Sequence, residues 1–168
     1  MNNDHPPCGA LHAQAEQAGL PSYAVTANVL LAAQPAPEDW ARFAADDYVT
    51  VLNIRSDPER AAEQARNAEA AGLRYIHAPW PAYLLEPEHL AAFAAIVENP
   101  DTGKLVFHCR SATRVGLIWL LYRTEHHGWS RAQAEAELRA AGYEADALET
   151  FEFCADDYLD RAAGQPAG

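Results

Sequence analysis

The chain has 168 residues, of which 49% are hydrophobic, so it is long enough to bury one substantial core. Its formal charge of −12 argues against nucleic acid and anionic membranes as partners, because both need a basic face. No stretch reaches the roughly 20 apolar residues of a membrane-spanning helix. With three cysteines and no apolar leader, we expect a reducing, cytoplasmic location.

The composition along the chain predicts one domain over residues 23–163. Residues 1–22 are rich in proline and glycine and are expected to form a poorly ordered lead-in, and residues 164–168 are expected to form a frayed tail. Cys8 and His12 lie in the lead-in, but two scattered ligands do not define a metal site. We therefore expect neither a metal nor a cofactor.

The first part of the predicted domain alternates short strands with helices. Residues 25–33 predict one or two strands, and the spacing of Trp40 and Phe43 predicts a helix after them. Residues 48–54 are apolar and rich in β-branched side chains, which is typical of a central strand.

A helix is predicted over residues 58–71, with Asp57 as its N-terminal cap. Arg55 precedes this cap and follows the predicted central strand, at the sheet edge where open α/β sheets bind ligands. It is therefore a candidate anion-binding residue. An ion pair of Arg55 with Asp57 or Glu59 is an equally good alternative.

A third core strand is predicted over residues 73–78, followed by a loop that ends near Glu86. Glu86 is the carboxylate of this loop, so it is a possible general acid. It can also simply precede an amphipathic helix over residues 87–98. We favour the second interpretation.

The most informative stretch joins a short apolar strand over residues 104–107 to an apolar helix over residues 115–122. Cys109 and Arg114 lie between them, with His108 directly before the cysteine. Backbone N–H groups in so tight a turn, together with the N-terminus of the following helix, form a cradle for an anion. The same positive field stabilises a thiolate, and a guanidinium group suits a tetrahedral oxyanion. The pattern predicts a nucleophilic cysteine that faces an anionic substrate.

Two further helices complete the predicted domain. Ser130 and Gln133 predict a capping box for a helix that runs to residue 141, and a last helix is expected over residues 144–162. Strands that alternate with helices predict a single α/β domain, with a mostly parallel sheet of four to five strands and helices on both faces.

The run His-Cys-Arg-Ser-Ala-Thr-Arg-Val-Gly, residues 108–116, resembles the signature loop of cysteine-dependent protein-tyrosine and dual-specificity phosphatases. It is closer still to a bacterial phosphatase-like and sulfurtransferase-like branch whose loop reads Cys-x-x-Gly-x-Arg. The wider resemblance covers roughly residues 25–142. It implies a phosphatase-like fold, with Cys109 and Arg114 as catalytic residues. The substrate-binding residues that it implies are His108, Arg110, Ser111, Ala112 and Thr113. Arg55 is added to them because it is expected at the carboxyl edge of the sheet.

The loop also departs from the common phosphatase pattern. Arg114 comes five positions after Cys109, whereas the common phosphatase loop has its arginine six positions after the cysteine. A spacing of five is the one found in rhodanese sulfurtransferases. Ala112 replaces the loop glycine, so a positive φ there is strained. The hydroxyl residue that usually follows the arginine is absent, and Ser111 or Thr113 is the candidate to replace it.

The resemblance extends to the loop after the third strand. Trp80-Pro81-Ala82 resembles the acid loop of tyrosine phosphatases, with alanine where the aspartate belongs. Without that acid, a phosphatase is expected to be slow on poor leaving groups, because general acid catalysis typically contributes about 10²–10⁴-fold.

Three interpretations remain. The first, which we favour, is hydrolysis of tyrosine-type or aryl phosphate monoesters through a phosphocysteine on Cys109. The second is rhodanese-type sulfur transfer through a persulfide on Cys109, which needs no such acid. The third is an anion-binding module without catalysis. In each case the expected partner is a small anionic substrate or a phosphorylated protein.

Overall fold

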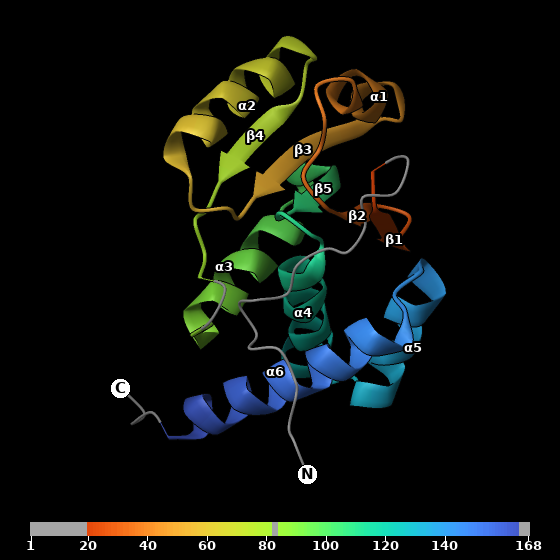
Figure 1. Ribbon diagram of the computed structural model, residues 1–168, viewed down its shortest axis with the longest axis vertical. Coiled ribbons are helices and arrows are strands. Elements are labelled where there is room, and N and C mark those ends of the chain that lie inside the picture. The colour runs from red at the N-terminus through yellow and green to blue at the C-terminus, as the bar shows by residue number, and fades with distance from the viewer. Residues whose placement is uncertain (1–19, 82–83, 165–168) are drawn as a thin grey trace.

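The computed structural model describes residues 20–81 and 84–164. The lead-in expected over residues 1–22 falls almost entirely outside the described residues, as does most of the expected tail. The helices and strands are arranged around one sheet (Figure 1).

The sheet has five strands in the order β1-β2-β5-β3-β4. The first two strands, β1 and β2, pair antiparallel, whereas the pairs β2–β5, β5–β3 and β3–β4 are parallel. The strands are β1 Ser22–Thr26, β2 Val29–Ala32, β3 Tyr48–Asn53, β4 Arg74–His77 and β5 Lys104–His108. The prediction of a mostly parallel sheet of four to five strands is therefore confirmed.

Helices cover both faces of the sheet, as predicted (Figure 1). One face packs against α1 and α2, and the other against α3 and α4, with α5 and α6 packed on α4. The helices are α1 Asp39–Ala45, α2 Pro58–Ala70, α3 Pro87–Val97, α4 Thr113–Leu121, α5 Arg131–Ala141 and α6 Ala145–Ala163, with a 3₁₀ turn η1 at Pro100–Thr102.

The central strand β5 is buried on both faces. Leu105 and Phe107 belong to the core beneath α3 and α4, whereas Val106 belongs to the core beneath α1 and α2, and all three have 0% exposure. A continuous apolar run without alternation is what a parallel strand covered on both faces requires. By contrast, β4 lies at the edge of the sheet with half-buried and exposed side chains, so the prediction of a third core strand over residues 73–78 was wrong in its burial.

Two predicted helix starts are confirmed by their capping contacts. The Asp57 side chain accepts hydrogen bonds from the N–H groups of Glu59 and Arg60 at 3.0 and 3.1 Å. Ser130 and Gln133 form the reciprocal capping box at the start of α5. In each case the contacts are local, so the sequence pattern is sufficient to find them.

The apolar run after Cys109 forms α4, which is buried almost throughout. It continues into a π-helical turn, η2 Tyr122–His126, which the periodicity did not predict. Apolar as α4 is, no helix in the two described segments combines the length and hydrophobicity needed to cross a membrane.

Gly116 allows α4 to pack closely against the C-terminal helices. A Cβ atom at this position would lie 2.5 Å from Cζ of Phe151 and 3.0 Å from Cζ of Tyr143. Both rings are buried, with exposures of 0% and 5%, so neither can move aside into solvent. The absence of a side chain at this position therefore allows the Phe151 and Tyr143 rings to pack directly against the backbone of α4.

We predict that Gly116→Ala lowers the free energy of unfolding by about 1–3 kcal/mol through overpacking. The higher helix propensity of alanine, about 1 kcal/mol, acts in the opposite direction and is the smaller effect. Denaturant unfolding measures the change, and Phe151→Leu in the Gly116→Ala background should recover part of it. An increase in stability on Gly116→Ala would mean that the packing at this point is loose.

Candidate active site

Three parallel strands bring the predicted site residues to one edge of the sheet. The register aligns His108 at the end of β5 with Ala32 of β2 and with Asn53 of β3. The residues that follow these strand ends, Gln34, Arg55 and Cys109, therefore leave the sheet at the same carboxyl edge. Cys109 is a free thiol with 1% exposure.

The backbone of the Cys109 loop, residues 109–114, is fastened to the segment that follows β2. The N–H group of Cys109 donates to the carbonyl of Ala32 at 3.3 Å, and the N–H group of Gln34 donates to the carbonyl of Arg110 at 3.2 Å. Ser111 forms an isolated bridge with Ala33. The loop thus continues to bond to the segment after β2 beyond the parallel β2–β5 pairing, through an antiparallel bridge, and these contacts restrain its backbone.

Ala112 has φ 66° and ψ 8°, the left-handed conformation, and caps the N-terminus of α4. This confirms the strain expected at the position where related loops carry glycine, since a left-handed alanine costs roughly 1–2 kcal/mol. A left-handed residue beside right-handed ones turns successive N–H groups toward a common point, which is the geometry of an anion-binding nest.

Tyr143 supports this turn, and no sequence pattern predicted its role. Its hydroxyl donates to the Ala112 carbonyl at 2.6 Å, and its ring stacks on Tyr23 at a centroid distance of 3.8 Å. Burial raises the pKa of Tyr143 well above its usual value, and the nearby Cys109 and Tyr23 raise it further. The hydroxyl therefore stays protonated and remains a donor to the loop.

Several guanidinium groups lie near Arg55, which itself lies near Cys109. Burial lowers the pKa of Arg55, the nearby Arg60, Arg110 and Arg114 lower it further, and Cys109 acts in the opposite direction. The Nη1 atom of Arg55 donates to Oε1 of Gln34 at 2.6 Å. Positive charges held this close together favour an anion among them.

The alternative ion pairs of Arg55 are not formed. Asp57 caps α2 instead, and no ion pair within the described segments joins Arg55 to Asp57 or Glu59. The Arg55 backbone is also fixed, because its N–H group donates to Oδ1 of Asn53 at 2.8 Å and its carbonyl contacts the His77 ring. Arg55 therefore remains available to an anion at the sheet edge.

Arg114 connects the Cys109 loop to the loop after β4. Its Nη1 atom donates to the carbonyl of Trp80 at 3.3 Å, and the Trp80 ring packs edge-on against Phe107. The Trp80-Pro81 segment thus lies beside the predicted catalytic arginine. Ala82, the position compared with the acid of tyrosine phosphatases, lies outside the described residues.

Glu86 lies directly before α3, which begins at Pro87. This is the position expected if Glu86 simply precedes the helix, which was the favoured interpretation. Its N–H group donates to Nδ1 of His89 at 2.9 Å, which closes the first turn of the helix. The preceding residue, Leu85, is held by Arg161 of α6, whose Nη1 atom donates to the Leu85 carbonyl at 2.8 Å. A general-acid role for Glu86 stays a prediction.

The two loop hydroxyls lie together, with Oγ of Ser111 3.0 Å from Oγ1 of Thr113. Arg110 is exposed, whereas Ser111 and Thr113 are half-buried. Their contacts with substrate, and the replacement of the missing hydroxyl by one of them, stay predictions.

His108 is fully buried behind Cys109. Its Nδ1 atom lies 3.3 Å from the Cys109 carbonyl, and its ring meets Trp40 edge-on on the α1–α2 face of the sheet. Burial lowers the pKa of His108 to about 3. The imidazole is therefore neutral near pH 7 and contacts the backbone of the nucleophile, while its predicted contact with substrate stays a prediction.

Several solved structures are similar to this chain in fold. Tk-PTP in its active form has a TM-score of 0.62 and 17% identity, covering 80% of this chain and 96% of that one. A variant of P. aeruginosa TpbA in complex with pTyr has a TM-score of 0.63 and 18% identity, covering 86% and 91%. PTPMT1 has a TM-score of 0.57 and 17% identity, covering 86% and 99%. The chain thus shares the fold of these structures.

The family is identified by sequence. The model of the phosphatase-like domain of beta-lactamase hydrolase-like proteins matches residues 22–126, and the chain belongs to this family. Beta-lactamase hydrolase-like proteins from two Xylella fastidiosa strains, Temecula1 and 9a5c, are each 24% identical over 125 residues. The match covers 71% of this chain but 29% of the relatives, so the chain corresponds to less than a third of their length.

The low pKa of His108 predicts acid sensitivity. The folded pKa is about 3. The unfolded value is about 6.5, so the unfolded state binds the extra proton between these two pH values. The free energy of unfolding should therefore fall as pH drops from about 6.5 toward 3, by up to about 1.4 kcal/mol per pH unit from this group. Denaturant unfolding at several pH values should show a shallower slope for His108→Gln, and equal slopes would contradict the assignment.

Tyr143→Phe removes the hydrogen bond to Ala112 and keeps the ring. We predict a loss of stability of about 0.5–1.5 kcal/mol. A phosphatase turnover number up to about tenfold lower is also expected, because the left-handed turn relaxes. The matched control is Tyr23→Phe, which removes a hydroxyl from the stacked ring and should leave turnover unchanged. Equal turnover of Tyr143→Phe and wild type, measured with the same aryl phosphate, would mean that the turn holds its shape without the hydrogen bond.

Proposed function

We propose that this domain hydrolyses phosphate monoesters with Cys109 as the nucleophile. The observation that carries the proposal is the position of a buried free thiol at the carboxyl edge of a parallel sheet, in a loop with a left-handed turn and several nearby guanidinium groups. Membership in the phosphatase-like family supports it. Because the chain covers 29% of its curated relatives, the proposal concerns this domain alone.

In the first step, the Cys109 thiolate attacks the phosphorus atom, a sulfur–phosphorus bond forms, and the bond from phosphorus to the ester oxygen breaks. The loop N–H groups and the Arg114 guanidinium bind the equatorial oxygens. Arg114 suits this role because it lies at the first turn of α4, where it also contacts the Trp80 loop. A phosphocysteine and an alkoxide or phenolate result, and the released oxyanion takes up a proton from solvent.

In the second step, water attacks the phosphorus atom, the sulfur–phosphorus bond breaks, and inorganic phosphate leaves with regeneration of the thiolate. The water proton passes to solvent or to a nearby base. Tyr143 contributes by holding the Ala112 peptide in place, and it does not exchange a proton itself because its pKa is raised.

The leaving group determines which esters are good substrates. The sequence has alanine at position 82, and Glu86 stands at the start of α3. If no acid protonates the ester oxygen, a phenolate leaves far more readily than an alkoxide. We therefore propose aryl phosphates of the tyrosine type as the substrate class, presented by a small molecule or by a phosphorylated protein. The complex of TpbA with pTyr agrees with this class.

The substrate side of the site has contributors beyond Cys109 and Arg114. Arg55 is proposed to approach the bound anion from β3, and the exposed Arg110 to contact groups that flank the phosphate. Local positive charge is necessary because the formal charge of the whole chain is −12 and repels anions. The cytoplasmic location stays a prediction.

We predict that the wild-type protein releases phosphate from aryl phosphates at least about 10²-fold faster than from alkyl phosphates. Phosphate release with a series of leaving groups measures this dependence. Cys109→Ser should abolish release, and Arg114→Lys should lose most of it, because a lysine cannot bind two oxygens in a fork.

Folding controls and a second substrate complete this experiment. Both variants should keep the unfolding midpoint of the wild type within experimental error, and thiosulfate with cyanide should be assayed in parallel. Rapid hydrolysis of alkyl phosphates would reveal a general acid, with Glu86 tested first by Glu86→Gln. Thiocyanate formation that needs Cys109, without phosphate release, would replace the proposal by sulfur transfer, which the length of the loop would then explain.

A further inference from the structure

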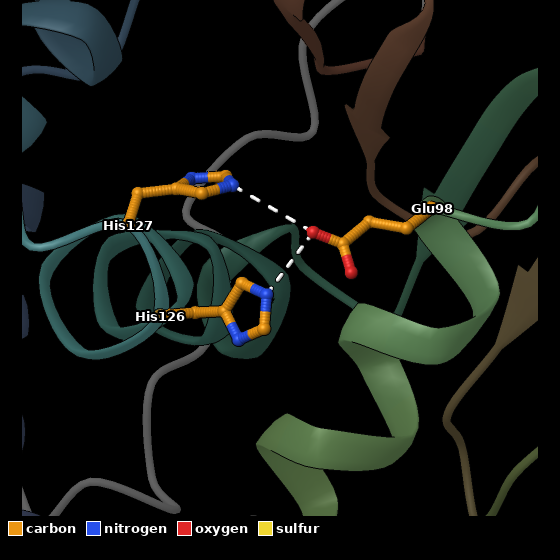
Figure 2. A group of neighbouring side chains, drawn as sticks. All are labelled: Glu98, His126 and His127. Carbon is orange, nitrogen blue, oxygen red and sulfur yellow. Dashed lines mark hydrogen bonds and ion pairs between the residues drawn. The ribbon is translucent and has the colours of Figure 1, made fainter.

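A second cluster of polar side chains lies at the far end of α4 from the Cys109 loop. It consists of Glu98, directly after α3, of His126, the last residue of η2, and of His127, directly after η2. Nε2 of His126 lies 3.0 Å from Oε1 of Glu98, and Nε2 of His127 lies 3.8 Å from the same oxygen. Figure 2 shows both imidazole rings directed at the carboxylate, and the three atoms lie within 4.8 Å of one another.

The convergence of two consecutive histidines needs an explanation, because adjacent residues of a regular α-helix point to different sides. Here the preceding turn, Tyr122–His126, is π-helical, which changes the direction of the side chains that follow. Such turns are rare and are frequently found at functional sites. The backbone of η2 therefore contributes a second, independent indication of a site.

Tyr122 holds the cluster in this arrangement. Its ring stacks on His126 at 5.3 Å and meets His127 edge-on at 4.5 Å, and its hydroxyl donates to Oε1 of Glu98 at 3.3 Å. The contacts with Tyr122 thus hold both imidazole rings in a defined orientation, although Glu98, His126 and His127 are all exposed. Exposed ion pairs contribute little to stability, so an ion pair alone gives little reason for this order.

Two imidazole nitrogens and one carboxylate oxygen form the donor set of a zinc-type transition-metal ion, whereas Mg²⁺ and Ca²⁺ prefer oxygen ligands alone. With metal–ligand bonds of about 2.0–2.1 Å, tetrahedral ligands are separated by roughly 3.3 Å. The observed separations of 3.0 and 3.8 Å from the carboxylate oxygen lie on either side of this value. Exposed histidine side chains can close the remaining distance by rotation.

We propose that Glu98, His126 and His127 bind one divalent transition-metal ion, with Zn²⁺ as the typical member of its class. Each imidazole binds through Nε2, so its ring proton lies on Nδ1. Nη1 of Arg123 lies 3.2 Å from Nδ1 of His127, and this contact lengthens when the ion binds. Arg123 stays in place because its Nε and Nη2 atoms donate to the Glu137 carboxylate at 2.9 and 2.8 Å.

The ion joins the end of α3 to the turn after α4. Because the nine residues of α4 separate this cluster from the Cys109 loop, by about 14 Å of helix, the ion does not take part in the reaction. A cation that binds the folded state stabilises it by an amount that rises with the logarithm of the ratio of its free concentration to its Kd. The negative charge of the chain favours the local accumulation of cations.

The test uses full-length protein in a Cys109→Ser background, so that the active-site thiolate does not bind the ion. Calorimetric titration with Zn²⁺ and visible absorption on titration with Co²⁺ measure stoichiometry and coordination. We expect one ion per chain, with an affinity at least about tenfold lower in Glu98→Gln and in His126→Asn. Glu125→Gln is the matched control, because it removes the same charge from the exposed face of η2 and leaves the cluster intact.

The increase in unfolding temperature on addition of Zn²⁺ should be lost in the same two variants and retained in Glu125→Gln. Equal affinity in Glu98→Gln and wild type would overturn the proposal, as would the absence of a bound ion at micromolar Zn²⁺. Neither result depends on phosphatase activity, so this proposal and the proposed function stand or fall separately.

Discussion

The hydrogen bond from Tyr143 to the carbonyl of Ala112 stabilises the left-handed turn on which the Cys109 loop depends. Alanine in this conformation is strained, so the surrounding structure must hold it. Three features do so together: the 2.6 Å hydrogen bond, the stack of Tyr143 on Tyr23, and the close approach that Gly116 permits. The anion cradle is therefore built by tertiary packing as much as by its own sequence.

Because the Cys109 loop depends on Tyr143, the part of the chain that the family model matches depends on the part that follows it. The family match ends at residue 126, whereas Tyr143 precedes α6 and Arg161, which holds Leu85, lies near the end of that helix. The C-terminal part of the chain thus contacts both loops of the candidate site: Tyr143 contacts the Cys109 loop, and Arg161 contacts the loop before α3. The part that the family model matches supplies the parallel strands β3 and β5, whose carboxyl ends bring Arg55 and Cys109 together.

The sequence was sufficient wherever the determining contacts are local. Asp57 and the pair Ser130–Gln133 were identified as caps because a cap bonds to residues two or three positions away. Cys109 and Arg114 were found in the same way, from the pattern of strand, tight turn and buried helix. The strain at Ala112 followed from the absence of the loop glycine.

The contacts that were missed join residues far apart in the chain. Tyr143 lies 31 positions from Ala112, and the Arg114–Trp80 hydrogen bond spans 34 positions. Neither separation leaves a periodic signal. The π-helical turn was missed because the residues that follow Tyr122 in it are polar or charged and carry no apolar periodicity. The edge position of β4 was missed because strand order depends on pairing across the whole sheet.

The central claim is that phosphate passes through the sulfur of Cys109. The most direct measurement is rapid acid quenching during turnover of an aryl phosphate, followed by mass spectrometry of the peptide that contains Cys109. The account predicts a phosphoryl group on Cys109 that forms before phosphate release reaches its steady rate and that is absent in Cys109→Ser. Phosphate release at the wild-type rate without any phosphorylated Cys109, when the quench is faster than turnover, would contradict it.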